Sequence, residues 1–341
     1  MVDFYLFRHG ETDMNKQARW QGSGIDSELN EDGRRQAREL AEKLKYAGLD
    51  VVYSSPLKRA HETAVFVGQA ANVKVVDVPE LIEACLGDTE GKTHLEIRKL
   101  FPVLNRQWHC LDDEFLDVRY PNGESKREIQ QRMTAALKKL AQTGYQKIGI
   151  SGHSAVLRYF FLQTGIRMPN VPHGTPFLVR YENGVFTYDE SNPVYVRPLE
   201  KRDVETAVAL IKEVFMRFEA PDYPPEGVEA FLRFIAPENL EKNVSLYGAF
   251  SGKELLGAAG VRNETHICLL FVKEAFQKQG IGKKLIKSVL STLARDAYKR
   301  STVNAAPTAV GFYERMGFKA VSDVQNKDGI SFVEMCCSLT G

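Results

Sequence analysis

The sequence predicts an α/β protein of two domains, the first built around a mostly parallel β-sheet with helices on both faces. The chain has 341 residues, and a domain takes roughly 100–200 residues, which predicts two domains. In the first half, short apolar runs alternate with helical patterns, and this βαβα order is typical of a parallel sheet covered by helices. Near residues 188–203 the pattern begins again with a new strand and helix, which indicates the second domain.

The elements of the first half can be justified in order. Asn30 is a candidate N-cap for a helix whose apolar residues recur at i, i+3, i+4 and i+7. Ser55 and Pro56 have the chemistry of an N-cap followed by proline at the first helical position. The predicted strands are 4–7, 51–54, 73–78 and 147–151, and a further helix is predicted at 155–162.

The second half begins at a breaker, Asn192 followed by Pro193, so the predicted domains are 1–192 and 193–341. After a helix-rich stretch to about 234 the pattern indicates a meander of three strands joined by polar turns. A helix with an apolar stripe follows the third strand. The predicted elements are strands 246–250, 255–261 and 267–272, helix 280–297, a strand at Val303, helix 309–315 and strand 330–336.

Composition excludes several classes of partner. Lysine and arginine number 45 against 44 acidic residues, for a net charge of +1, so neither nucleic acid nor an anionic membrane is expected. The five cysteines show no CxxC or zinc spacing, which favours reduced thiols in a cytoplasmic protein. No signal peptide and no apolar run of transmembrane length is expected.

Charged and imidazole side chains follow four of the predicted strands. Arg8 and His9 end the first strand, Arg59 opens the helix after the second, Glu83 lies beyond the third, and His153 follows the fourth. In an open parallel sheet, ligands bind outside the carboxyl ends of the strands. We therefore expect these five side chains to meet at one edge of the sheet.

Such a cluster suits phosphoryl transfer better than metal binding. Two arginines keep their charge, so they oppose a divalent metal and favour an anion, whose oxygens match guanidinium forks. His9 could act as the nucleophile that takes the phosphoryl group, and Glu83 as the acid that protonates the leaving group. Gly10 is expected to let the backbone approach the phosphate closely.

Each of these residues also has a simpler interpretation. An isolated histidine at a strand end is more often a satisfied polar residue, Arg59 could lie on a surface helix, and Glu83 could be a solvated loop charge. We favour the cluster because its members converge on one edge. His173, in "VPHGTPF", could approach the site, but a surface loop is the favoured interpretation. No role is assigned to the remaining histidines, which are His61, His94 and His109. Phe101 and Trp108 are expected in the core of a helical insertion rather than over the site.

At this point the first half resembles a known family. The motifs "LFRHGET", "QGSGIDSELNEDGRRQA", "SSPLKRAHETA", "LIEACLGDTEG", "YPNGES" and "ISGHSAVLR" are similar to those of the histidine phosphatase superfamily, phosphoglycerate mutase-like, over about residues 1–191. The resemblance implies a phosphoglycerate mutase-like α/β/α sandwich, with His9 as nucleophile, Glu83 as proton donor and a phosphate pocket. The implied phosphate pocket consists of Arg8, Arg59 and His153, and the implied substrate-binding residues are Asn15, Gln21 and Gly22.

The family pattern is not matched at every position, and two activities stay open. Met14 and Thr89 stand where the family often has tryptophan, and Ser154 where it often has glycine, which bears on substrate fit. The short "LIEACLGDTEG" segment resembles the phosphatase branch, so hydrolysis of a small phosphorylated metabolite without a metal is expected first and mutase-type phosphoryl transfer second.

A second motif lies in "FVKEAFQKQGIGKKL", where glycines end a loop and open a helix after a strand. Backbone N–H groups at such a helix start can bind a pyrophosphate, and the lysines around it add positive charge, although a lone Gly-x-Gly is also found in simple turns. With "NAAPTAVGFYERMGF", the segment 194–339 resembles the Gcn5-related N-acetyltransferase (GNAT) family, an α+β fold with a central mixed sheet.

That resemblance implies acetyl-CoA as co-substrate and an amine as acceptor. The implied acetyl-CoA residues are Val272, Gln277, Lys278, Gly280, Gly282, Lys283 and Asn304. Tyr313 matches the family tyrosine that protonates the departing thiolate, with a core aromatic as its simpler interpretation. No general base is evident, and Glu264 and His266 are weak candidates. A domain that binds acetyl-CoA without turnover and regulates the phosphatase is the alternative, and a homodimer is left open.

Overall fold

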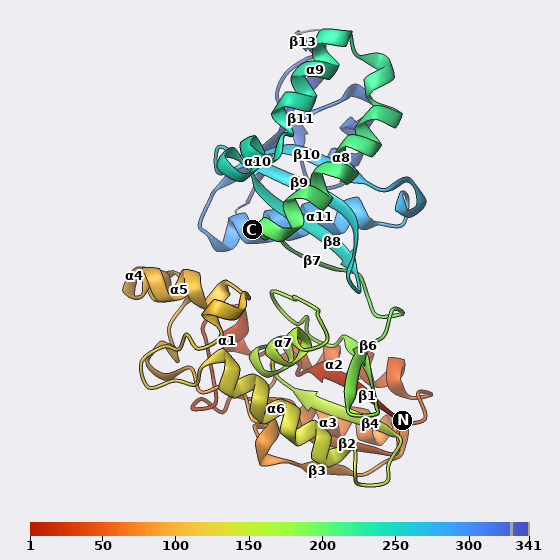
Figure 1. Ribbon diagram of the computed structural model, residues 1–341. Helices are drawn as coiled ribbons and strands as arrows, with labels where there is room; N and C mark the ends of the chain where they lie inside the picture. The colour runs from red at the N-terminus through yellow and green to blue at the C-terminus, as the bar shows by residue number, and fades with distance from the viewer. Residues whose placement is uncertain (328–329, 340–341) are drawn as a thin grey trace. The chain divides into compact units, whose positions relative to one another are not determined.

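The first half of the chain is organised by a sheet with strand order β3-β2-β4-β1-β5-β6 (Figure 1). Its strands are β1 (Val2–Arg8), β2 (Val51–Ser54), β3 (Val75–Asp77), β4 (Lys147–Gly152), β5 (Pro176–Glu182) and β6 (Val185–Tyr188). The pairs β1–β4, β4–β2 and β2–β3 are parallel, whereas β5 and β6 add antiparallel strands beside β1. The computed structural model describes residues 1–327 and 330–339.

Helices cover both faces of this sheet because β1 is apolar on both. On one face, Phe7 packs with residues of α2 and α3, such as Leu40 and Val67. On the other, Phe4 contacts Phe186, which in turn contacts Phe160 of α7. The helices of this half are α1 (Asp13–Lys16), α2 (Glu31–Leu44), α3 (Lys58–Ala71), α4 (His94–Leu100), α5 (Pro102–His109), α6 (Lys126–Leu140) and α7 (Ser154–Leu162).

The chain divides into two compact units between Pro193 and Val194. The second unit has a sheet of order β12-β14-β11-β10-β9-β8-β7, in which β10 and β11 alone are parallel, and β13 pairs with β14. Its strands in the described residues are β7 (Tyr195–Pro198), β8 (Ser245–Ser251), β9 (Glu254–Arg262), β10 (His266–Val272), β11 (Arg300–Ala305), β12 (Lys319–Ala320), β13 (Gln325–Lys327) and β14 (Ile330–Ser338).

Helices pack on both faces of this sheet as well. Leu285 and Val289 of α11 belong to the same apolar core as Ile267 of β10, whereas Phe271 of β10 contacts Phe231 of α9. The helices are α8 (Val204–Phe218), α9 (Pro225–Phe234), α10 (Pro237–Asn243), α11 (Ile281–Arg295) and α12 (Val310–Glu314). In the part of the chain described here, no helix is both long and apolar enough to cross a membrane.

The predicted fold class is confirmed, with corrections at several boundaries. The third strand is shorter than predicted, at Val75–Asp77, and the last strand runs on to Ser338. The prediction that Ser55 caps a helix is wrong, because α3 starts at Lys58 with Leu57 as its N-cap. Strands β5 and β6 were not predicted, since a short alternation of polar and apolar residues is weak evidence without knowledge of the neighbouring strand. Helix α6 was also missed, although Ser125 and Glu128 form a capping box and apolar residues recur at helical spacing behind it.

Candidate functional site

The structure gathers the five predicted phosphoryl-transfer residues at the carboxyl edge of the first sheet. His9 directly follows β1, Arg59 is in the first turn of α3, and His153 is the N-cap of α7 after β4. Glu83 follows the short 3-10 helix at Pro79–Leu81. All five, Arg8 included, are no more than 8% exposed, so their charges act in a poorly solvated site.

The backbone around His9 fixes which ring nitrogen can react. Nδ1 of His9 lies 2.6 Å from the carbonyl oxygen of Gly10, and because a carbonyl only accepts, Nδ1 carries the proton. The lone pair is therefore on Nε2. His173 donates from its own Nδ1 to the carbonyl oxygen of His9 at 2.6 Å, and the centroids of the two imidazole rings are 5.4 Å apart.

Three nitrogen atoms beside His9 are buried without a hydrogen-bond partner in the described part of the chain. They are Nε of Arg8, Nε of Arg59 and Nδ1 of His153. A buried N–H without a partner is costly, and the great majority of buried polar groups have one. Two guanidinium N–H groups and an imidazole edge beside a nucleophile are the donors that the equatorial oxygens of a phosphoryl group require.

The far ends of both arginines are tied to the backbone. Nη1 of Arg8 donates to the carbonyl oxygen of Val171 at 3.0 Å. Arg59 donates to the carbonyl oxygens of Ile25 and Gly22 at 2.7 and 2.8 Å. These bonds hold each guanidinium plane in place and leave the Nε–H free to bind a ligand.

Ser55 orients the second histidine instead of capping a helix. Its hydroxyl oxygen accepts the Leu57 N–H at 3.3 Å and lies 2.7 Å from Nε2 of His153. When this hydroxyl donates to Nε2, the proton of the neutral imidazole is on Nδ1, the atom without a partner.

Electrostatics keeps the imidazoles neutral at physiological pH. Burial, followed by the charges of His153, Arg59 and Arg8, lowers the pKa of His9 well below 6.5. Burial and the same two arginines lower the pKa of His153 in the same way. Burial and Arg8 lower the pKa of His173 to about 3. A neutral His9 has its lone pair available as a nucleophile.

The lowered pKa values predict that acid weakens the fold. Below pH 6.5 these three imidazoles become protonated in the unfolded chain, whereas in the folded state their lowered pKa values keep them neutral. The free energy of unfolding should therefore fall as pH drops below 6.5, by up to about 1.4 kcal/mol per pH unit for each imidazole. Urea unfolding at several pH values measures this slope. His173→Asn should make the slope shallower, and an unchanged slope would contradict the assignment.

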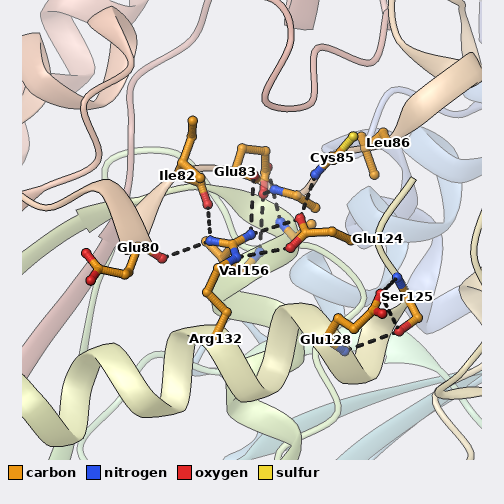
Figure 2. A network of polar contacts seen from close by, with 12 residues as sticks. Glu80, Ile82, Glu83, Cys85, Leu86, Glu124, Ser125, Glu128, Arg132 and Val156 are labelled. Carbon is orange, nitrogen blue, oxygen red and sulfur yellow. Dashed lines mark hydrogen bonds and ion pairs between the residues drawn. The ribbon is translucent and has the colours of Figure 1, made fainter. Parts of the chain in front are cut away.

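Glu83 binds the start of α7 with its carboxylate. Oε1 accepts the N–H groups of Ala84 at 2.9 Å and Val156 at 3.3 Å, and Oε2 accepts that of Ala155 at 3.3 Å (Figure 2). His153, the N-cap, makes no side-chain cap, so Glu83 takes that role. These three bonds hold the carboxyl group of Glu83 at the start of α7, next to the N-cap His153.

The three predicted substrate-binding residues make hydrogen bonds within the protein. Asn15 forms a capping box with Thr12, and the amide of Gln21 donates to the same hydroxyl oxygen at 2.9 Å. Gly22, at φ 60°, offers its carbonyl oxygen to Arg59. The structure thus gives Gly22 a part in placing Arg59, and Asn15 and Gln21 a part in holding Thr12, whereas direct contact of these three residues with a substrate stays a prediction.

One favoured interpretation at this site is wrong: His173 is half-buried against His9 rather than in a surface loop. The N–H of Gly10 donates to the Thr63 hydroxyl at 3.1 Å and so is engaged within the protein, whereas close approach of this backbone to a phosphate stays a prediction. Its lack of a side chain serves packing: a Cβ there would lie 2.3 Å from the carbonyl oxygen of Gly33. Neither contact leaves a local signal in the sequence.

In the second unit, the parallel strands β10 and β11 separate after a short paired stretch. Their register comprises His266 with Thr302 and Ile267 with Val303, although β10 continues to Val272. The register of β10 with β9 also shifts between Ile267 and Leu269. The strands therefore diverge toward α11, which begins beyond the end of β10.

The start of α11 fits the pyrophosphate of acetyl-CoA. Gly280 is the N-cap with φ 84°, no side chain caps the helix, and a Cβ there would meet nothing within 4 Å. The first-turn N–H groups are thus left for an anion, with the exposed Lys278 and Lys283 nearby in the sequence. Gln277 donates to the Val272 carbonyl oxygen at 3.1 Å, which closes the loop before the helix.

The remaining predicted acetyl-CoA residues lie in different surroundings. Gly282 is in the first turn of α11, where a Cβ would lie 3.6 Å from the Phe312 ring. Asn304 is exposed on β11. Tyr313 is 6% exposed on α12, between the rings of Phe312 and Phe318. Burial, followed by Glu219 and Cys268, raises the pKa of Tyr313, so its phenol keeps its proton at neutral pH.

Glu219 is a carboxylate that the sequence analysis missed. It follows α8, and burial raises its pKa, while the Tyr223 hydroxyl lies 3.5 Å from Oε2. Of the two bases considered from the sequence, Glu264 is in a turn at φ 67°, and the ring of His266 lies 2.9 Å from the Thr302 hydroxyl. Glu219 is the better candidate because its charge acts on Tyr313.

Comparisons with known proteins match both units. Residues 4–173 match the family model of the histidine phosphatase superfamily (branch 1), and residues 219–339 match that of the acetyltransferase (GNAT) domain. Phosphoserine phosphatase 1 of Hydrogenobacter thermophilus is 32% identical over 162 residues, which cover 47% of this chain and 75% of that protein. A protein named "Probable phosphoglycerate mutase GpmB", of Proteus mirabilis, is 40% identical over 137 residues, 40% of this chain and 62% of that protein.

A solved structure matches the fold of the first unit. Mycobacterial hydrolase 1 superposes with a TM-score of 0.51 at 24% identity, covering 56% of this chain and 98% of that structure. At this level of identity the likeness shows the fold and no more.

Proposed function

The chain is an enzyme that belongs to the histidine phosphatase superfamily and carries an acetyltransferase (GNAT) domain. From this premise we propose two activities. The first unit hydrolyses a small phosphate monoester through phosphorylated His9, and the second transfers acetyl from acetyl-CoA to an amine. Both family resemblances noted in the motifs are thereby confirmed. The observation that carries the phosphatase proposal is the set of three buried nitrogen atoms beside a neutral His9 that have no hydrogen-bond partner among the described residues.

The proposed hydrolysis has two steps. Nε2 of His9 attacks phosphorus, the bond from phosphorus to the ester oxygen breaks, and the carboxylic acid of Glu83 gives its proton to that oxygen. Water then attacks the phosphohistidine, the carboxylate of Glu83 takes a proton from it, and the P–N bond breaks. Arg8, Arg59 and His153 stabilise the phosphoryl oxygens in both steps.

A mutase would share the first step but return the phosphoryl group to a second hydroxyl instead of water. The relatives carry names of both kinds, one a phosphatase and one a mutase. We place hydrolysis first because of the short segment after Glu83. The proposed substrate is a small phosphorylated metabolite, and the proposed compartment is the cytoplasm.

A panel of phosphorylated metabolites, assayed for released phosphate in the presence of EDTA, tests this proposal. We expect phosphate release from at least one monoester at a rate that the chelator leaves unchanged. Transfer of the phosphoryl group between metabolites without release of phosphate would favour the mutase. An activity that EDTA abolishes would contradict the proposed metal-free mechanism.

For the second unit, acetyl-CoA supplies the acetyl group as a thioester. Glu219 is proposed to take the proton from the attacking amine, since its raised pKa makes it a stronger base than an ordinary carboxylate. Tyr313 is proposed to donate a proton to the departing thiolate. Release of thiol with a panel of amines measures transfer. Acetyl-CoA that changes the phosphatase rate with no release of thiol would instead favour the regulatory alternative.

The start of α11 allows a matched pair of variants at Gly280. Asparagine and aspartate both tolerate the left-handed backbone at φ 84°, and the space beside the Cβ is open. Gly280→Asp places a carboxylate where the pyrophosphate is proposed to bind, so it should weaken coenzyme A binding about tenfold relative to Gly280→Asn. Calorimetric titration with coenzyme A measures both affinities, and equal values would contradict the pyrophosphate site.

A further inference from the structure

The proposed proton donor lies on a segment without regular structure. Residues 82–86 are neither helix nor strand, although Glu83 must hold its carboxylate beside the phosphate. Bonds to α7 fix the carboxylate oxygens, but they leave the course of the backbone to other contacts. Those contacts come from α6 and from the residue before its N-cap.

Arg132 of α6 reaches across to this segment (Figure 2). Its Nη1 donates to the carbonyl oxygens of Glu80 and Ile82, each at 2.8 Å, and its Nη2 lies 3.5 Å from that of Glu83. One guanidinium group therefore faces three carbonyl oxygens within residues 80–83, the last of which is the carbonyl oxygen of the proton donor itself.

Glu124 completes the arrangement from the residue before the N-cap of α6. Its carboxylate accepts Nε and Nη2 of Arg132, both at 3.0 Å, in a two-pronged ion pair. The same carboxylate accepts the Cys85 N–H at 2.8 Å, and the backbone N–H of Glu124 donates to the Cys85 carbonyl oxygen at 2.8 Å (Figure 2). The side chains of Arg132 and Glu124 are 21% and 26% exposed, so water competes with the pair only in part.

We propose that Arg132, held by Glu124, is a positioning residue for the phosphatase reaction, because it fixes the segment from which Glu83 donates its proton. This inference rests on the proposed function of Glu83. Each nitrogen of the Arg132 guanidinium group donates to a carbonyl oxygen of residues 80–83 or to the Glu124 carboxylate. The contact therefore requires the planar shape of the guanidinium group as well as its positive charge. The positive charge also acts on the site itself, since Arg132 contributes to the lowered pKa of His153.

A positioning role differs from a merely structural one in how the rate depends on the leaving group. An alkyl phosphate releases a strongly basic alkoxide, which needs the proton from Glu83. 2,4-Dinitrophenyl phosphate releases a weak base that leaves without one. A misplaced proton donor should therefore slow hydrolysis of the alkyl ester far more than that of the dinitrophenyl ester.

The experiment compares kcat/KM for an alkyl phosphate substrate and for 2,4-dinitrophenyl phosphate in full-length variants. Arg132→Met should lower kcat/KM about 10- to 100-fold for the alkyl ester and less than about threefold for the dinitrophenyl ester. Glu83→Gln should show the same preference between the two esters, with a larger loss on the alkyl ester. Arg132→Lys keeps the charge without the fork and should fall in between. Arg127→Met is the matched control, because Arg127 lies on the same helix and pairs with the exposed Asp117.

Each outcome decides the matter. An equal loss on both esters for Arg132→Met and Arg132→Lys, or no loss, would overturn the positioning role if Glu83→Gln shows the leaving-group pattern. If Arg132→Met does not fold, Arg132→Lys and Glu124→Gln supply the same comparison. If Glu83→Gln itself discriminates no leaving group, the proposed function of Glu83 is wrong and the inference about Arg132 falls with it.

Discussion

Replacing His9 by alanine is expected to lower phosphatase kcat/KM by at least about 1,000-fold, because no other side chain can take over as nucleophile at that point of the site. Nε2 of His9 bears the lone pair, since Nδ1 is committed to the Gly10 carbonyl oxygen. The neighbouring His153 has its Nε2 engaged by the Ser55 hydroxyl, and His173 is held at Nδ1 by the carbonyl oxygen of His9. Release of phosphate from the best substrate measures the loss.

Two controls accompany this variant. His61→Ala removes an exposed histidine that pairs with Asp77, and it should keep wild-type activity. Coenzyme A binding by His9→Ala should equal that of the wild type, since His9 and the start of α11 belong to different units. A His9→Ala protein that still hydrolysed phosphate esters at the wild-type rate would refute the mechanism.

Arg59→Lys is expected to lower kcat/KM by about 100- to 1,000-fold, a loss typical of removing one preorganised donor from a catalytic site. Lysine keeps the positive charge and can satisfy one of the carbonyl oxygens of Gly22 and Ile25. It lacks the Nε–H, the buried donor that has no partner in the described part of the chain. Inhibition by vanadate, measured beside the rate, should weaken in parallel.

The control for Arg59 is an arginine of similar chemistry on the surface. Arg34→Lys changes a partly exposed pair with Glu62 and should leave both the rate and vanadate inhibition unchanged. Equal vanadate affinity in Arg59→Lys and the wild type would mean that Nε of Arg59 does not face the phosphoryl group.

The edge of the first sheet could be predicted from the sequence because its signals are local. Apolar strands that end on Arg8, His9 and His153 place those residues at one edge once the strands are known to be parallel. The meander and the glycine-rich helix start of the second unit were predictable for the same reason, since apolar runs, turn residues and glycine spacing lie within short windows.

The supporting contacts could not be predicted, because they join residues far apart in the chain. His173 touches His9 across 164 positions, and Arg132 reaches Ile82 across 50. Glu219 follows a helix whose own pattern marks only its apolar face, and nothing in that pattern shows that its charge acts on Tyr313. Such contacts depend on how helices pack, which a single sequence without its fold does not specify.

The most direct measurement is to trap the covalent intermediate. The enzyme is mixed with a labelled phosphate ester, quenched in alkali within a single turnover and digested for mass spectrometry. The account predicts a phosphoryl group on His9 that is stable to alkali and labile to acid, and that is lost in His9→Ala. A label on any other residue, or phosphate release with no label on His9 at any time in the turnover, would contradict it.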